Sequence, residues 1–205
     1  MIVSVSTWDE PEEEHARSVR APFPGALLIA STELYEPTFR RTVVYLIDHD
    51  ASGTLGVVLN RPSETAVHDV FPQWAPLVAK PQALFIGGPV SRESAVCLGT
   101  VRPGLSADGV EGLKQVEGRT VMVDLDADPE YLAPLLAGIR VFVGYAGWSG
   151  GQLGSELARD DWMMFPSLPA DVLAPARIDL WGQVLRRQSA RYSMLATHPI
   201  DVDRN

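Results

Sequence analysis

The sequence predicts an α+β domain built on a mixed, largely antiparallel sheet. Candidate strands come in adjacent pairs in the first half of the chain, and strands alternate with candidate helices in the second half. Strands joined by short loops pair antiparallel, whereas a doubly wound parallel sheet needs a long crossover between its strands. The chain has 205 residues, of which 46% are hydrophobic, and this is enough for one domain with its own core.

The first half contains a predicted hairpin. An apolar strand is expected over residues 25–30, followed by strands over 42–47 and 55–59. The polar turn 49–53, His-Asp-Ala-Ser-Gly, separates the second and third strands, so these two strands pair antiparallel. The hairpin ends at Asn60-Arg61-Pro62, because proline cannot donate a hydrogen bond to a strand ladder.

The middle of the chain is expected to hold one short helix, three strands and one long surface loop. These elements are helix 66–71, strands 83–86, 95–101 and 120–125, and loop 101–118, which has room for one short element. Thr65 is the expected N-cap of the helix, and Pro72 ends it. Gly87-Gly88-Pro89 predicts a turn between two of the strands.

The last third begins with a strong helix start at Asp128-Pro129-Glu130, where a capping carboxylate precedes a proline at the first helical position. Leu132, Leu135 and Leu136 supply its buried face, and Gly138 ends it. The elements expected after it are a strand over 139–143, a glycine-rich turn over 144–151, a helix through Leu153 and Leu157, a short apolar segment over 162–165 and a last helix over 178–192.

Residues 1–22 are expected to form a flexible acidic tail, residues 23–198 a single domain and residues 199–205 a C-terminal tail. The net charge of −9 argues against a surface that attracts nucleic acid or anionic lipid. No apolar run reaches the roughly 20 residues that span a bilayer, and the acidic N-terminus does not fit a signal peptide. The single cysteine, Cys97, cannot form an internal disulfide and is expected to be buried. These features predict a cytoplasmic protein without a membrane segment.

The segment Gly147-Trp148-Ser149-Gly150-Gly151 matches the G-x-S-x-G pattern of a serine hydrolase, between a predicted strand and a predicted helix. Acids and then His198 follow it, which gives the order serine, acid, histidine. Hairpins, however, occupy the region where a hydrolase fold needs parallel strands. Ser149 and Gln152 also have the S-x-x-Q spacing of a helix capping box. We therefore assign no catalytic residue and keep a serine hydrolase using Ser149 and His198 as the alternative.

The sequence indicates no metal site and no cofactor. The four histidines lack metal-binding spacing, and Pro129 stands where a calcium loop derived from Asp124, Asp126 and Asp128 needs its turn glycine. The arginine cluster at Arg186, Arg187 and Arg191 suits a helix C-terminus. Direct DNA binding is not expected, because the chain is acidic and shows no recognition motif.

Several blocks, taken in order, resemble the YqgE/AlgH family of bacterial proteins. They are Pro24–Ala30, Phe39–Val44, His49 to Pro62, Gly87–Val90 and Gly144–Leu153, with Glu156 and Trp162 after them. The resemblance implies an α+β fold around a flattened, barrel-like sheet with helices packed around it, in a cytoplasmic protein with no established activity. Some family members carry the label of transcriptional regulators. Gly154 stands where the family pattern has a glutamate.

The leading functional hypothesis is a non-catalytic domain that binds an unidentified small ligand or protein partner and acts in regulation; the sequence assigns no oligomeric state. The glycine loops and the hairpin turn are expected to line the main surface depression. The candidate binding residues are His49, Asn60, Arg61, Gly87, Gly88, Trp148, Gly150, Gly151, Gln152 and Glu156. In the alternative interpretation, the glycines only permit tight packing, and Arg61 pairs with Glu156 as a structural ion pair.

Overall fold

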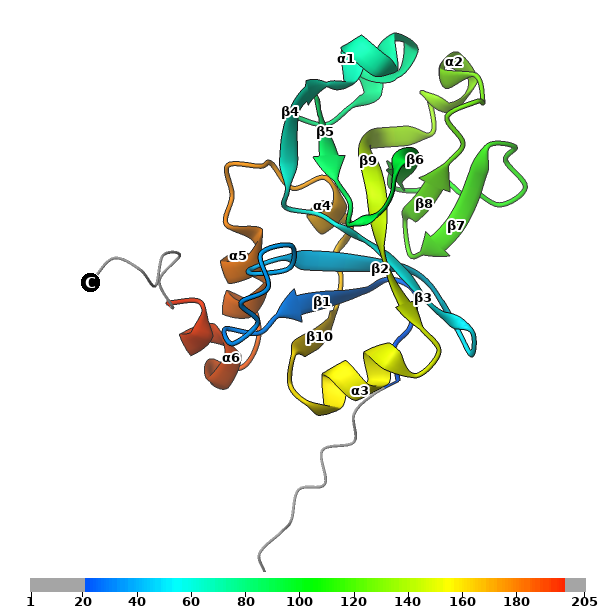
Figure 1. Cartoon of the computed structure of the whole chain (residues 1–205). Helices are drawn as coiled ribbons and strands as arrows, with labels where there is room; N and C mark the ends of the chain where they lie inside the picture. Colours follow the sequence, from blue (N-terminus) through cyan, green and yellow to red (C-terminus); the bar gives the residue numbers. More distant parts are fainter. Residues whose placement is uncertain (1–20, 198–205) are drawn as a thin grey trace, which may run out of the picture.

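A computed structural model describes residues 21–197 (Figure 1). It contains a curled ten-stranded sheet with short helices around it, and the predicted fold class is confirmed. The strands are β1 Ala26–Ala30, β2 Val43–Asp50, β3 Gly53–Val58, β4 Pro62–Ala66, β5 Ala83–Ile86, β6 Val90–Val101, β7 Leu113–Glu117, β8 Thr120–Val123, β9 Leu136–Ser149 and β10 Trp162–Pro166. The helices are α1 Val67–Val70, α2 Pro129–Leu132, α3 Gln152–Ala158, α4 Pro169–Val172, α5 Leu180–Arg186, α6 Ala190–Leu195 and the 3-10 helix Pro72–Leu77.

The strand order is β10-β1-β2-β3-β9-β6-β8-β7, with β4 paired to β5 and β5 to β9. Within residues 21–197, the paired strands are antiparallel except β5 and β9, which run parallel. Residues 136–145 of β9 pair with β6 and residues 146–149 pair with β3, so this single long strand joins the two parts of the curled sheet. Figure 1 shows β9 running through the centre of the molecule.

The predicted hairpin is confirmed as β2–β3, and the strands predicted over 25–30 and 83–86 are confirmed as β1 and β5. Their side chains form the core because the apolar strands are covered by short helices. Trp181 of α5, for example, is buried beneath β1 and donates from Nε1 to the carbonyl of Ala30 at 2.8 Å. No helix in the described range is long and apolar enough to cross a membrane.

The predicted turn over 144–151 is wrong, because β9 continues through it to Ser149. Gly144 has φ of +68°, and a Cβ atom there would lie 2.7 Å from the carbonyl oxygen of Gly88 and 2.8 Å from that of Val90. The glycine thus serves a close approach of β9 to the start of β6. Sequence alone does not distinguish a glycine that makes a turn from one that lets two backbones touch.

Three predicted helices differ from the structure. The helix at Asp128 is confirmed at its start, where the Asp128 side chain accepts from the amide of Glu130, but α2 ends at Leu132 and Leu136 already belongs to β9. The last helix is two helices, α5 and α6, interrupted around Ser189, whose backbone is extended. Thr65 is not a cap, because it lies within β4 and α1 begins after Ala66 without a side-chain cap.

Three short elements were not predicted: β4, α4 and the 3-10 helix Pro72–Leu77. Edge strand β4 begins at Pro62. Proline is tolerated there because this residue is the first of a strand that is paired on one side only. Helix α4 is held by Asp171, whose carboxylate accepts from the Leu168 amide and pairs with Arg187 at 2.6 Å. The expected surface loop 101–118 contains β7.

Candidate functional site

A shallow depression of about 400 Å³ lies where the β2–β3 hairpin, the start of β6 and the end of β9 meet. Its lining residues are Asp48, Asp50, Ser52, Gly53, Thr54, Leu55, Val90, Tyr145, Gly147 and Trp148. The structure therefore brings together the hairpin turn, the segment after Gly87-Gly88-Pro89 and part of the glycine-rich segment.

Glycines hold the hairpin against the end of β9. A Cβ atom on Gly53 would lie 2.5 Å from the carbonyl oxygen of Trp148, and one on Gly150 would lie 2.5 Å from that of Ala51. Both neighbours are backbone atoms, which cannot move without shifting β9 or the hairpin turn. Gly53 and Gly150 are therefore close backbone contacts that fix one wall of the depression.

The Gly87-Gly88 turn is held against β9 in the same way. A Cβ atom on Gly87 would lie 2.3 Å from the Gly144 carbonyl oxygen, and one on Gly88 would lie 2.2 Å from the Tyr145 backbone. Directly after this turn, Val90 is 38% exposed at the depression, and Ser91 has a left-handed φ of 46°. A non-glycine residue in that conformation is held by its surroundings. Tight packing is thus the role of these glycines, and the packing forms the depression.

The hairpin contributes two carboxylates that the sequence analysis did not select. Asp50 Oδ1 accepts from the Ser52 hydroxyl at 2.5 Å, the Ser52 amide at 2.7 Å and the Gly53 amide at 3.1 Å. These hydrogen bonds, that of the Ser52 hydroxyl first, lower the pKa of Asp50. Asp48 Oδ1 accepts from the His49 amide at 2.9 Å. The sequence signal that could have identified them is the Asp48-His49-Asp50 segment at the end of β2, because residues two apart in a strand point to the same face.

His49, a predicted site residue, points its ring to a neighbour within the hairpin. Its Nδ1 lies 2.7 Å from the Thr54 hydroxyl. His49 is not among the residues that line the depression. It therefore stabilises the hairpin that carries the two carboxylates.

Glu156 is the centre of a closed hydrogen-bond network below β9. Its Oε2 accepts from the indole nitrogens of Trp148 and Trp162, both at 2.8 Å, and its Oε1 accepts from Gln152 Nε2 at 3.0 Å. The Phe39 ring packs against both indoles. Three donors satisfy this carboxylate, so the predicted site residues Trp148, Gln152 and Glu156 form a structural unit under α3.

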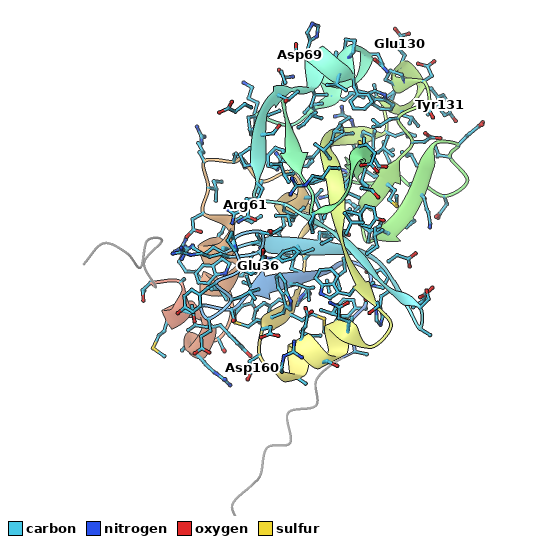
Figure 2. All side chains as sticks on the ribbon, viewed as in Figure 1. Glu36, Arg61, Asp69, Glu130, Tyr131 and Asp160 are labelled. Atoms are coloured by element: carbon cyan, nitrogen blue, oxygen red, sulfur yellow. The ribbon has the colours of Figure 1, made fainter. Side chains whose placement is uncertain are left out.

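Asn60 and Arg61 also have structural partners. Asn60 Oδ1 accepts from the Val43 amide at 3.0 Å, and its Nδ2 donates to the Arg41 carbonyl at 2.8 Å. Arg61 donates to the Arg40 carbonyl, and burial, followed by the nearby charge of Arg40, lowers its pKa. The expected Arg61–Glu156 ion pair is wrong. Figure 2 shows Arg61 far from Asp160, which follows α3.

Ser149 does not have the geometry of a nucleophile. It lies in β9 in register with Gly53, and its φ is not in the positive range of a strained turn. Its hydroxyl donates to Gln152 Oε1 at 3.1 Å, and the same oxygen accepts from the Ser149 amide at 3.0 Å. His198 lies outside the described residues. Among those described, no histidine is hydrogen-bonded to Ser149, and the hydrolase alternative gains no support.

The expected capping box is only half formed. Gln152 reaches back to the Ser149 amide, but the N-cap of α3 is Gly151, which has φ of +78° and no side-chain cap. Helix α3 therefore begins at Gln152, directly after Gly151, whose left-handed backbone cannot be part of a right-handed helix. A Cβ atom on Gly151 would meet nothing within 4 Å.

The arginine cluster is engaged within the protein. Arg187 forms a two-point contact with Asp171, at 2.7 and 2.6 Å, and Arg186 lies 3.8 Å from Asp179. In residues 21–197 no group of three or more His, Cys, Asp or Glu side chains could hold a metal ion. Cys97 is buried as expected, and its burial raises the pKa of the thiol.

The fold and the depression define a class: an α+β domain on a curled sheet, with an open surface hollow and no assembled nucleophile and base in the described range. Comparison with known proteins then gives the family. Residues 27–193 match the AlgH-like family model, and the chain belongs to the AlgH-like family.

Relatives include UPF0301 proteins of Rhodococcus opacus, 62% identical, and Mycolicibacterium smegmatis, 61% identical, each over 96% of this chain and 98% of the relative. The crystal structure of protein DIP2367 from Corynebacterium diphtheriae is similar, with a TM-score of 0.84 and 43% identity over 87% of this chain and 93% of that one. The solution structure of AlgH from Pseudomonas aeruginosa has a TM-score of 0.63 and 26% identity over 87% of this chain and 96% of that one. The family resemblance is thereby confirmed.

Proposed function

We propose that this protein is a non-catalytic binding domain whose site is the depression between the β2–β3 hairpin, the start of β6 and the end of β9. The observation that carries the proposal is the convergence of these three segments on one hollow, each held by glycine contacts to backbone. Loops and strand ends positioned by a rigid sheet are the usual place for binding residues. A preformed wall also reduces the entropy lost when a ligand binds.

The domain acts in regulation through a bound partner rather than by contacting DNA. Arg186 and Arg187 are paired with acids of the same chain, which leaves this cluster poorly suited to phosphate groups. The net charge of −9 adds a repulsion toward nucleic acid.

Amide NMR spectra test the binding site. The probes are three blocked tripeptides with leucine at both ends and lysine, glutamine or glutamate in the centre, added at millimolar concentration. We expect at least one of them to shift the amide signals of residues 48–55, 90 and 145–148 selectively. If none does, the proposed site is overturned.

An ester assay tests the absence of catalysis. We expect p-nitrophenyl acetate to be hydrolysed at the same background rate by the wild type and by the Ser149→Ala variant, because Ser149 donates to Gln152 and has no base in the described range. Activity that disappears in Ser149→Ala would support the hydrolase alternative.

A further inference from the structure

The depression combines negative charge with apolar surface. Asp48 and Asp50 line it, and no lysine, arginine or histidine does. Neither carboxylate forms an ion pair within residues 21–197. The hydrogen bonds that Asp48 and Asp50 accept within residues 21–197 all use Oδ1, so their Oδ2 atoms accept none from this part of the chain. Asp48 and Asp50 are each oriented by hydrogen bonds to Oδ1 and have an Oδ2 atom available as an acceptor, which favours binding of a positively charged group.

The rest of the lining suits an aliphatic chain. Leu55, Val90 and Tyr145 supply apolar surface, and Val90 is 38% exposed. Gly147 lies beside the Tyr145 ring, since a Cβ atom on Gly147 would be in ordinary contact with Tyr145 Cε2 at 3.5 Å. Lysine and arginine place their apolar stems on such surface while the charged end meets a carboxylate or the face of a ring.

The shape of the site favours a side chain attached to a partner over a free molecule. Pockets for small ligands enclose about 70–90% of the ligand surface, whereas this depression is shallow. Two apolar residues close to Val90 in the chain are also exposed, namely Pro89 and Ile86, the latter by 43%. These residues surround the rigid Gly87-Gly88 turn and could contact the residues that flank a basic side chain.

We infer that the depression takes the lysine or arginine side chain of an extended segment of a partner protein, with apolar residues of that segment against the Ile86–Val90 turn. This inference rests on the proposed binding site and adds the chemistry of its occupant. Attraction between the two carboxylates and the basic group also predicts that binding weakens as salt is added.

The three tripeptides used above test the inference through their relative affinities. We expect the lysine peptide to bind about tenfold more tightly than the glutamine peptide, and the glutamate peptide to bind least. An Asp48→Asn/Asp50→Asn variant should bind the lysine peptide no better than the glutamine peptide. Asparagine keeps an Oδ1 acceptor for the hairpin amides, so melting temperature should change little; if the double variant fails to fold, Asp48→Asn alone carries the test.

A matched control is Asp69→Asn/Glu130→Gln, which removes the same charge at the α1 and α2 end of the molecule (Figure 2). It should bind the lysine peptide like the wild type. Equal binding of the lysine and glutamine peptides would overturn the inference and leave the binding site standing, whereas no binding of any peptide overturns both. The free amine n-butylammonium should bind more weakly than the lysine peptide; equal affinity would overturn the assignment to a partner segment.

Discussion

The carboxylates on the two sides of the end of β9 differ in how many hydrogen-bond donors surround them. Ala146 and Trp148 pack in one apolar cluster with Leu153 and Leu157 of α3, while Tyr145 and Gly147 line the depression, which Trp148 also borders. Under α3, Glu156 has three donors and two of them are indoles. At the depression, Asp48 and Asp50 keep oxygens without a partner in the described chain. A carboxylate with all its partners stabilises the fold, and a carboxylate with spare acceptors is available to a ligand.

The largest change in stability is expected for the Glu156 hydrogen-bond network under α3. Glu156→Ala leaves the indole nitrogens of Trp148 and Trp162 without their acceptor. Trp148 is 6% and Trp162 4% exposed, so water cannot fully replace it. An unsatisfied buried donor costs about 1–3 kcal/mol, and we expect the free energy of unfolding in urea to fall by about 3 kcal/mol.

Glu156→Gln is the control for this change. Glutamine keeps an oxygen that can accept from an indole, so the loss should be roughly half as large. Peptide-induced shifts at residues 48–55 should persist in this variant, because glutamine can still accept from Trp148 and residue 156 is not bonded to Asp48 or Asp50. Equal losses for the alanine and glutamine variants would contradict the assigned role of the acceptor oxygen.

A smaller loss of stability is expected from Gly150→Ala, which changes the contact between the β2–β3 hairpin turn and the segment that follows β9. The new Cβ atom would lie 2.5 Å from the Ala51 carbonyl oxygen, so the hairpin must move away from β9. Overpacking of this kind costs about 1–3 kcal/mol. Urea unfolding should report that loss, and peptide binding should weaken because one wall of the depression shifts.

Gly154→Ala is the matched substitution four residues further on. Gly154 lies inside α3, and a Cβ atom there meets nothing within 4 Å. Alanine is more favourable than glycine in a helix by up to about 1 kcal/mol, so this variant should be more stable than the wild type. A destabilised Gly154→Ala, or an unaffected Gly150→Ala, would show that backbone contact does not separate the two glycines.

The smallest effect is expected at Asp50 in acid. Its hydrogen bonds stabilise the ionised form and hold its pKa below the ordinary value of 3.8. A lowered pKa in the folded state means that this stabilisation is present above the unfolded value and is lost as pH falls through the folded value. The amide signals of Ser52 and Gly53 should therefore titrate below pH 3.8. In Asp50→Asn, which lacks the carboxyl group, the amide signals of Ser52 and Gly53 should not titrate in this pH range.

The sequence predicted the elements whose signals are local. The β2–β3 hairpin follows from two apolar runs around a polar turn, and the Asp128 cap lies two residues from the amide that it accepts from. The grouping of the hairpin turn with the glycine segments also came from local composition, since glycines near strand ends mark a close approach of some kind. Composition could not say whether backbone or ligand makes that approach.

The remaining features depend on partners that are distant in the chain or in space. Gly144 lies inside a strand because the carbonyls of Gly88 and Val90 come against it, and the last helix is interrupted where Arg187 meets Asp171. Glu156 was identified from the sequence as a polar group facing a site, yet only the fold brings two indoles to one of its oxygens. By itself the sequence determined the fold class, the family and which residue types could act as donors and acceptors. The tertiary structure alone decided which of them pair, because pairing depends on positions in space that strand order and register set.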